Sequence, residues 1–306
     1  MLSVKPWKPD AVIRFVLGVF ICIFAGSLVM TALEHGGTKH PTLFYVLGAA
    51  SLAFLGAALV AIRRPWKLEN FMQRVWVLLV LFYVGLVLGA FAQKYAGDPG
   101  SPVPSVAELV VNSLSFQGAT LVLAVFFLRE HQVTWNAAFG FSNNWRRSVM
   151  LGVMCACIFL PIGWALQQIS VQVLTHIPHW NIRPQEQAPV QTLKLATSWT
   201  DRLVLGVVTI LLAPAAEELL FRGVLYPWIR QAGFPKLALF GTALLFGAMH
   251  LNAQAFIPLF TLAVILALLY ERTNNLLVSM TAHSLFNGFN FALLYLLEKQ
   301  SSGAPY

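Results

Sequence analysis

The sequence predicts an all-α integral membrane protein, a polytopic helical bundle of about eight or nine transmembrane spans. Two observations carry this prediction. The 306 residues are 58% hydrophobic and only 10% charged, with a mean hydropathy of +0.71, whereas soluble chains average about 25% charged residues. The apolar residues also run unbroken for about 20 positions, the length with which an α-helix crosses a bilayer, instead of alternating as in outer-membrane barrels.

The apolar runs give the expected spans in chain order. The first span is 12–33. Residues 1–33 begin with Lys5, Lys8 and Arg14 but have no clear small-residue cleavage site, so we expect a retained anchor rather than a signal peptide. The run at 236–251 is short, and it shares one crossing with a neighbour if the spans number eight. The polar stretch 175–201 is expected to form an outer connection that holds a short interfacial helix. The remaining spans are expected at 42–62, 75–93, 106–128, 147–174, 202–226, 254–271 and 276–297.

The distribution of positive charge predicts the orientation of this bundle. Connections on the side of the N-terminus hold thirteen Lys and Arg residues, and those on the other side hold six. Because short cytoplasmic loops carry the excess of Lys and Arg, we expect a cytoplasmic N-terminus. The same rule accounts for the net charge of +8, so the bilayer is an expected partner and nucleic acid is not. Cys22, Cys155 and Cys157 lie in apolar runs and suggest no disulfide framework.

Few acids and histidines fall inside the spans, and most of them lie late in the chain. An ionisable side chain at bilayer depth costs about 2.5–3.5 kcal/mol on insertion scales, so such residues usually mark function. Glu108 lies early in its span, where we expect a structural hydrogen bond. The others are Glu217, Glu218, His250 and His283, with Asn287 one helical turn after His283.

Helical spacing suggests different roles for the two adjacent glutamates. Glu218 and Arg222 are four residues apart and share a helix face, where they can form an ion pair. Glu217 is rotated by about 100° from Glu218, which frees its carboxylate for proton transfer. The alternative is a purely structural charge cluster of Glu217, Glu218 and Arg222.

Together these residue types supply the chemistry of peptide-bond hydrolysis. A glutamate whose basicity is raised by apolar surroundings can take a proton from water. A neutral imidazole can donate a hydrogen bond to an oxyanion or hold a metal ion, and the NH₂ group of an asparagine can complete an oxyanion site. A carboxylate, two histidines and an asparagine on three apolar helices therefore predict water activation within the membrane.

Three motifs in order carry a family resemblance: Glu217-Glu218-x-x-x-Arg222, Phe246-x-x-x-His250 and His283-x-x-x-Asn287. This set resembles the CPBP family of intramembrane endopeptidases, the CAAX protease and bacteriocin-processing (Abi) family, which is related to type II CAAX prenyl endopeptidase. The resemblance covers roughly residues 200–297. It implies that Glu217 is the catalytic base and His250 a second essential residue. It further implies that His283 and Asn287 belong to the oxyanion or metal site, with Glu218, Arg222 and Phe246 in support.

The resemblance leaves the cofactor open, because family members have been described both as glutamate-dependent proteases and as metalloproteases. Either no cofactor is needed, or a divalent ion such as zinc binds Glu217, His250 and His283. The chain has no His-Glu-x-x-His zinc motif. The expected substrate is a membrane-associated or lipid-modified peptide or protein.

Two other functions compete with hydrolysis. A membrane immunity or scaffold protein could use the same polar network for packing alone. A proton-coupled carrier also buries Glu and His, but the chain shows none of the internal repeats typical of such carriers. The expected organisation is an N-terminal helical part with the outer loop, 1–199, a catalytic core, 200–297, and a polar tail, 298–306.

Overall fold

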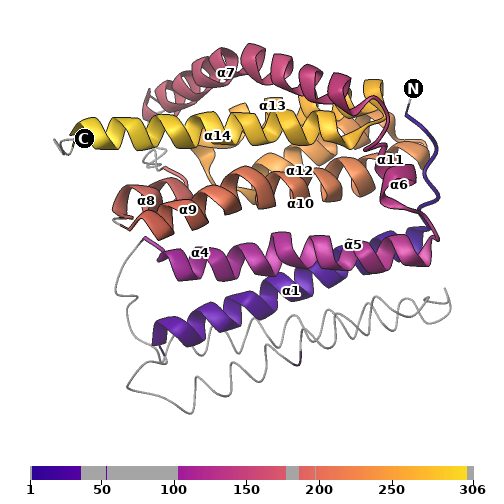
Figure 1. The fold of residues 1–306 in the computed structure, drawn as a ribbon, viewed down its shortest axis with the longest axis horizontal. Coiled ribbons are helices and arrows are strands. Elements are labelled where there is room, and N and C mark those ends of the chain that lie inside the picture. The colour runs from indigo at the N-terminus through magenta and orange to yellow at the C-terminus, as the bar shows by residue number, and fades with distance from the viewer. Residues whose placement is uncertain (1, 36–52, 54–102, 177–185, 197, 302–306) are drawn as a thin grey trace. The chain divides into compact units, whose positions relative to one another are not determined.

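The computed structural model describes residues 2–35, 53, 103–176, 186–196 and 198–301, drawn as coloured ribbon in Figure 1. All regular structure in this part of the chain is helical, which confirms the all-α class. The expected spans at 42–62 and 75–93 lie outside the described residues. Within them, five helices are long and apolar enough to cross a membrane: Pro9–Met30, Val106–Glu130, Trp145–His176, Trp199–Gln231 and Ala253–Thr273.

The chain divides into two compact units that do not follow the sequence order strictly. The first, here the C-terminal unit, comprises Met1–Pro6 and Val133–Tyr306, and the second, the N-terminal unit, comprises Trp7–Gln132. The sequence analysis instead expects a functional boundary at 199/200. That boundary stays a prediction, because the division into compact units does not test it.

The N-terminal unit pairs α1 (Pro9–His35) with the continuous run of α4 (Val106–Ser113), the π-helical segment η1 (Leu114–Gly118) and α5 (Ala119–Glu130). The side chain of Arg14 is buried between Asp10 and Glu130, with which it forms ion pairs. Glu108 makes the expected structural hydrogen bond: its Oε2 accepts from the backbone N–H of Ser105 at 2.8 Å. Ser105 caps the same helix in return, so Glu108 stabilises a helix start.

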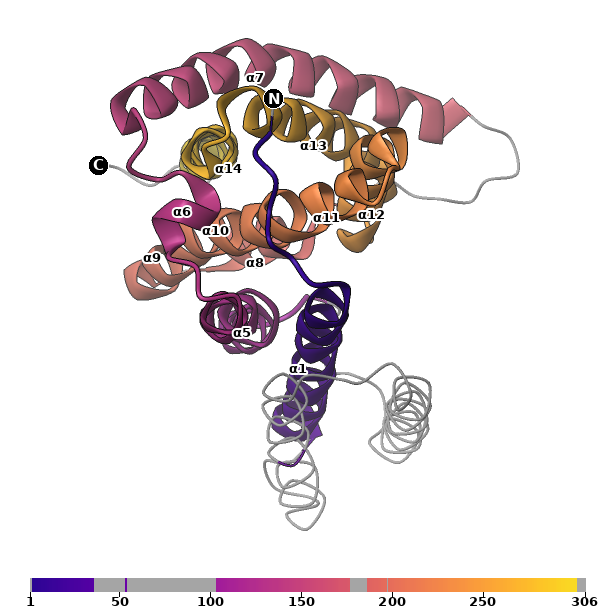
Figure 2. The ribbon, with the colours of Figure 1, turned by 90° about the vertical axis from the view of Figure 1, so that its right-hand side faces the viewer.

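The C-terminal unit is layered. Helix α7 (Trp145–His176) packs on α13 (Ala253–Thr273) and α14 (Leu276–Ser301). The run containing α10 (Ala213–Glu218) packs on the other side of α14 (Figures 1 and 2). Between α7 and α14, Phe159 and Ala282 join Leu262 and Leu266 of α13 in one buried apolar cluster. Shorter helices complete the unit: α6 (Trp135–Phe139), α8 (Ala188–Leu195), η4 (Leu237–Gly241) and α12 (Thr242–Met249).

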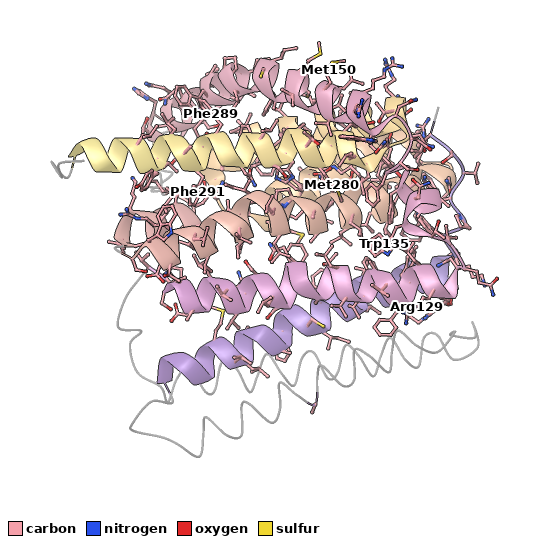
Figure 3. The ribbon with its side chains drawn as sticks, in the orientation of Figure 1. Arg129, Trp135, Met150, Met280, Phe289 and Phe291 are labelled. Atoms are coloured by element: carbon pink, nitrogen blue, oxygen red, sulfur yellow. The ribbon has the colours of Figure 1, made fainter. Side chains whose placement is uncertain are left out.

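Two sequence expectations on short elements agree with this arrangement. Helix α8 lies within the polar stretch 175–201, where a short helix is expected. The apolar helix Leu237–Met249 is shorter than the five candidate spans, as expected for the run 236–251. On the outer faces, apolar side chains such as Met150 of α7 and Phe289 of α14 are exposed (Figure 3), which is how helices meet lipid rather than water.

The helical run from Trp199 to Gln231 carries two π-helical segments, one on each side of the two glutamates of the first motif. It comprises α9 (Trp199–Val207), η2 (Val208–Leu212), α10 (Ala213–Glu218), η3 (Leu219–Leu225) and α11 (Tyr226–Gln231). Pro214 and Pro227 each follow the end of a π-helical segment. Because proline lacks an N–H and its ring clashes with the carbonyl four residues earlier, the wider π turn accommodates it. Such turns often occur at functional sites.

Candidate active site

The two adjacent glutamates lie at the end of the short helix α10. Their side chains are buried, with exposed fractions of 7% for Glu217 and 0% for Glu218. Such deep burial of two carboxylates requires compensating partners, and each glutamate has one on another turn or another helix.

Glu218 forms the ion pair that the sequence spacing predicts. Its Oε1 lies 2.6 Å from Nη1 of Arg222, one turn later in η3. Arg222 is itself 1% exposed, and its Nη2 donates to the backbone carbonyl of Ala263 on α13 at 3.1 Å. The expected Glu218–Arg222 pair is therefore confirmed, and it also ties η3 to α13.

His283 on α14 lies against both glutamates. Its Nδ1 is 3.0 Å from Glu218 Oε1, and its Nε2 is 3.9 Å from Glu217 Oε2. Because the partner of Nδ1 is a carboxylate oxygen already bound to Arg222, that nitrogen carries a hydrogen and donates it. The other nitrogen is thereby directed at Glu217. The second oxygen of Glu218, Oε2, is buried and has no hydrogen-bond partner among the described residues.

His250 ends α12 and is linked to this group through an aromatic ring. Its Nδ1 lies 2.7 Å from the carbonyl oxygen of Phe246, one turn earlier, so Nδ1 carries the hydrogen and Nε2 is the nitrogen left for other partners. The ring of Phe246 lies 4.9 Å from the His250 ring and 5.7 Å from the His283 ring, measured between centroids.

Asn287 lies one turn beyond His283 on α14, and its side chain is anchored to the π-helical segment η2. Its Nδ2 donates to the carbonyl oxygen of Thr209 at 3.0 Å. An amide NH₂ has two N–H groups, so this bond orients the group and occupies one of them. The sequence does not indicate Thr209 or Ala263 as site residues, because both act through backbone carbonyls that carry no sequence signal.

Comparison with known proteins assigns a family to this part of the chain. Residues 198–289 match the family model described as Rce1-like, type II CAAX prenyl endopeptidase Rce1-like. This region is similar to the type II CAAX prenyl endopeptidase family. The family resemblance based on the three motifs is thus confirmed, and every motif residue from Glu217 to Asn287 lies within the Rce1-like region. Comparisons with curated proteins and with solved structures each give no significant match.

The Rce1-like region does not offer a conventional metal site in this arrangement. In the part of the chain that the structure describes, no group of three or more His, Cys, Asp and Glu side chains is placed to hold a metal ion. His250 and His283 each engage Nδ1 in a hydrogen bond, which leaves Nε2 of each ring as the nitrogen that could bind a metal ion. Glu217, His250 and His283 are not grouped as a metal site among the described residues, and binding of a divalent ion by these three side chains stays a prediction.

Proposed function

We propose that the chain is an intramembrane endopeptidase that hydrolyses a peptide bond in a membrane-associated or lipid-modified peptide or protein. The observation that carries the proposal is the approach of Glu217 Oε2 to His283 Nε2, 3.9 Å apart, inside a region that matches an endopeptidase family. A carboxylate next to an orientated imidazole is an arrangement suited to proton transfer.

In the proposed reaction Glu217 acts as the general base. It takes a proton from a water molecule, whose oxygen attacks the scissile carbonyl carbon and forms a tetrahedral intermediate. The proton then passes to the amide nitrogen, directly from Glu217 or through His283 Nε2, as the C–N bond breaks. One carboxyl and one amine product result, and Glu217 returns to its starting state.

The other motif residues have supporting roles in this proposal. The N–H of Asn287 that is not bound to Thr209 is available for the developing oxyanion. His250 Nε2, which lacks a hydrogen in the neutral ring, accepts a hydrogen bond from the attacking water. Glu218, held by Arg222, fixes the tautomer of His283 through Nδ1.

The substrate class follows from the family and from the apolar surroundings. The family description names a CAAX prenyl endopeptidase, and a lipid-modified peptide of that type is the first substrate to test. The exposed apolar side chains near the site, including Leu245 and Leu251, suit a substrate that arrives within the bilayer.

The orientation and location belong to the same proposal. The charge distribution supports an N-terminus in the cytoplasm of a bacterial inner membrane. Reporter domains fused at the N-terminus and in the polar stretch 175–201 test this, because we expect them to report opposite sides. The same side for both fusions contradicts the proposed topology.

The decisive experiment compares purified wild-type protein with Glu217→Gln in lipid nanodiscs, using a fluorogenic lipid-modified peptide. Loss of a general base lowers rates by about 10²- to 10⁴-fold, so we expect cleavage to fall by that factor while yield and melting temperature stay near wild type. Glu108→Gln is the matched control, since Glu108 makes a helix-capping bond in the N-terminal unit.

Two outcomes contradict the proposal. If Glu217→Gln cleaves the peptide at the wild-type rate, Glu217 is not the general base. Absence of any cleaved product from the wild type, together with lower melting temperatures of the Glu217 and His250 variants, favours the scaffold alternative instead.

A further inference from the structure

One aromatic ring touches three of the polar site residues. Phe246 is 1% exposed, and the guanidinium carbon of Arg222 lies 4.7 Å from its ring centroid. The His283 ring meets it at 70° and the His250 ring at 52°, with centroids 5.7 and 4.9 Å away. Phe246 thus lies at the meeting point of α12, α14 and η3.

The electronic structure of the ring suits these neighbours. The face of an aromatic ring carries partial negative charge and its edge partial positive charge, so a buried guanidinium is attracted to the face. The His283 ring meets the same ring edge-on, and the His250 ring is tilted against it. The position of Phe246 therefore restricts where Arg222 and the two histidines can lie.

The backbone of the same residue acts on one histidine as well. The Phe246 carbonyl accepts from His250 Nδ1 at 2.7 Å, which selects the tautomer with a free Nε2. The hydrogen bond to Glu218 fixes the tautomer of His283. Arg222, the ion-pair partner of Glu218, lies over the Phe246 ring. The Phe246 backbone and Glu218 therefore set the two tautomers, whereas the Phe246 ring contacts both imidazoles and bears on their orientation.

A second buried phenylalanine in the same region serves as a comparison for Phe246. Phe221 is 2% exposed, packs edge-on against Phe246 at 5.4 Å and lies 5.9 Å from Arg222. It shares the burial and the cationic neighbour of Phe246, but its ring contacts are with Phe246 and Arg222 and not with the imidazoles described above.

We propose that Phe246 is a positioning residue whose ring holds His250 and His283 in the orientation used for hydrolysis. The expected change in kcat rests on the proposed endopeptidase function. The orientation of the imidazoles can be measured without activity. The inference assigns to the aromatic side chain a role beyond filling the core.

The test compares Phe246→Leu with Phe221→Leu in nanodiscs. We expect Phe246→Leu to lower kcat by about 10- to 100-fold, the cost of misplacing reacting groups by about 1 Å, with KM little changed and the pH profile of kcat shifted. Phe221→Leu should keep kcat within about threefold at a similar loss of melting temperature, because it removes packing but no imidazole contact. Phe246→Tyr, which keeps the aromatic face, should restore most of kcat.

A spectroscopic measurement separates this inference from the proposed function. In protein labelled with ¹⁵N-histidine, NMR shifts report the hydrogen bonding and the surroundings of each ring nitrogen. We expect altered signals of His250 and His283 in Phe246→Leu and wild-type signals in Phe221→Leu. If Phe246→Leu does not fold, Phe246→Met retains side-chain volume without the ring and carries the same comparison.

Unchanged histidine signals in the Phe246 variant overturn the inference, as does an equal loss of kcat in both phenylalanine variants. If the wild type cleaves no peptide, the proposed function fails, but the NMR comparison still decides whether Phe246 positions the imidazoles.

Discussion

Arg222 and Glu218 illustrate how the chain makes buried charge tolerable at the level of single residues. The guanidinium is 1% exposed and is satisfied by Glu218 Oε1, by the Ala263 carbonyl and by the face of Phe246. Removing one member of a buried pair leaves the other charge unpaired, which costs far more than the pair itself contributes. The two residues should therefore behave as one unit.

A double-mutant cycle tests this coupling. We expect Arg222→Met to lower the free energy of unfolding by about 3–5 kcal/mol, because Glu218 stays buried without its counterion. The double variant Glu218→Gln/Arg222→Met should lose clearly less than the sum of the single losses. Denaturant titration in detergent micelles measures these energies, and strictly additive losses would show that the pair is not coupled.

Helix packing decides how the elements that carry these residues meet. α7 and α14 come into close contact at Gly152, where a Cβ added to the glycine would lie 2.7 Å from both Thr281 Cβ and the carbonyl oxygen of Val278. Small residues at such contacts allow helices in membranes to approach closely. Thr281 and Val278 lie on the same helix as His283, so the distance between α7 and α14 also affects the position of His283.

Two identical substitutions in different packing environments test this contact. We expect Gly152→Ala to destabilise the protein by about 1–3 kcal/mol, because a backbone carbonyl stands in the way of the new methyl group. In Gly206→Ala the nearest atom, Phe291 Cζ, is 3.6 Å away, an ordinary contact, so this variant should be neutral or gain up to about 1 kcal/mol of helix propensity. Melting temperatures in micelles compare them, and equal destabilisation would contradict the close contact.

At the scale of the whole molecule, the first residues of the chain belong to the C-terminal unit rather than to the helix that follows them. Ser3 Oγ donates to Asn274 Oδ1 at 2.8 Å, and Lys5 Nζ donates to the Ala138 carbonyl at 2.7 Å. Leu2 packs on the cluster of Tyr226, Ala238 and Ala267. The segment 2–6, visible in indigo beside α6 and α11 in Figure 2, thus joins the ends of several helices of this unit.

Burial of Lys5 gives this segment a pH dependence. Desolvation lowers the pKa of Lys5 from 10.5 to about 8. Between these values the unfolded chain binds a proton that the folded chain has released, so stability rises with pH across this window. The full difference is at most about 3 kcal/mol, and it is lost progressively as the pH falls from 10.5 to about 8.

Unfolding of the wild type and of Lys5→Met between about pH 7 and 11 measures this effect, because this range brackets both pKa values. Because Met has no proton to release, the stability difference between the two proteins should shift in favour of the wild type as the pH rises from 8 to 10.5. Parallel stability curves over this range would show that Lys5 is not buried as described.

Much of the candidate site was accessible to prediction because its signals are local. Two glutamates and two histidines stand out from apolar runs, and the Glu218–Arg222 pair follows from the helical repeat alone. The family resemblance follows from spacings within single helices. The same reasoning could not find the carbonyl partners Thr209 and Ala263, because every residue has a carbonyl and only its neighbours select one.

The sequence by itself determined the membrane-helical class, the positions of most described helices and the polar residues that mark the site, because composition and periodicity act within one segment. Only the tertiary structure decided that His283 reaches Glu218 across 65 positions of chain, that Phe246 contacts two imidazoles, and that residues 2–6 join the C-terminal unit. These contacts depend on the register and crossing of packed helices, which side chains on both partners set together. No single segment carries that information.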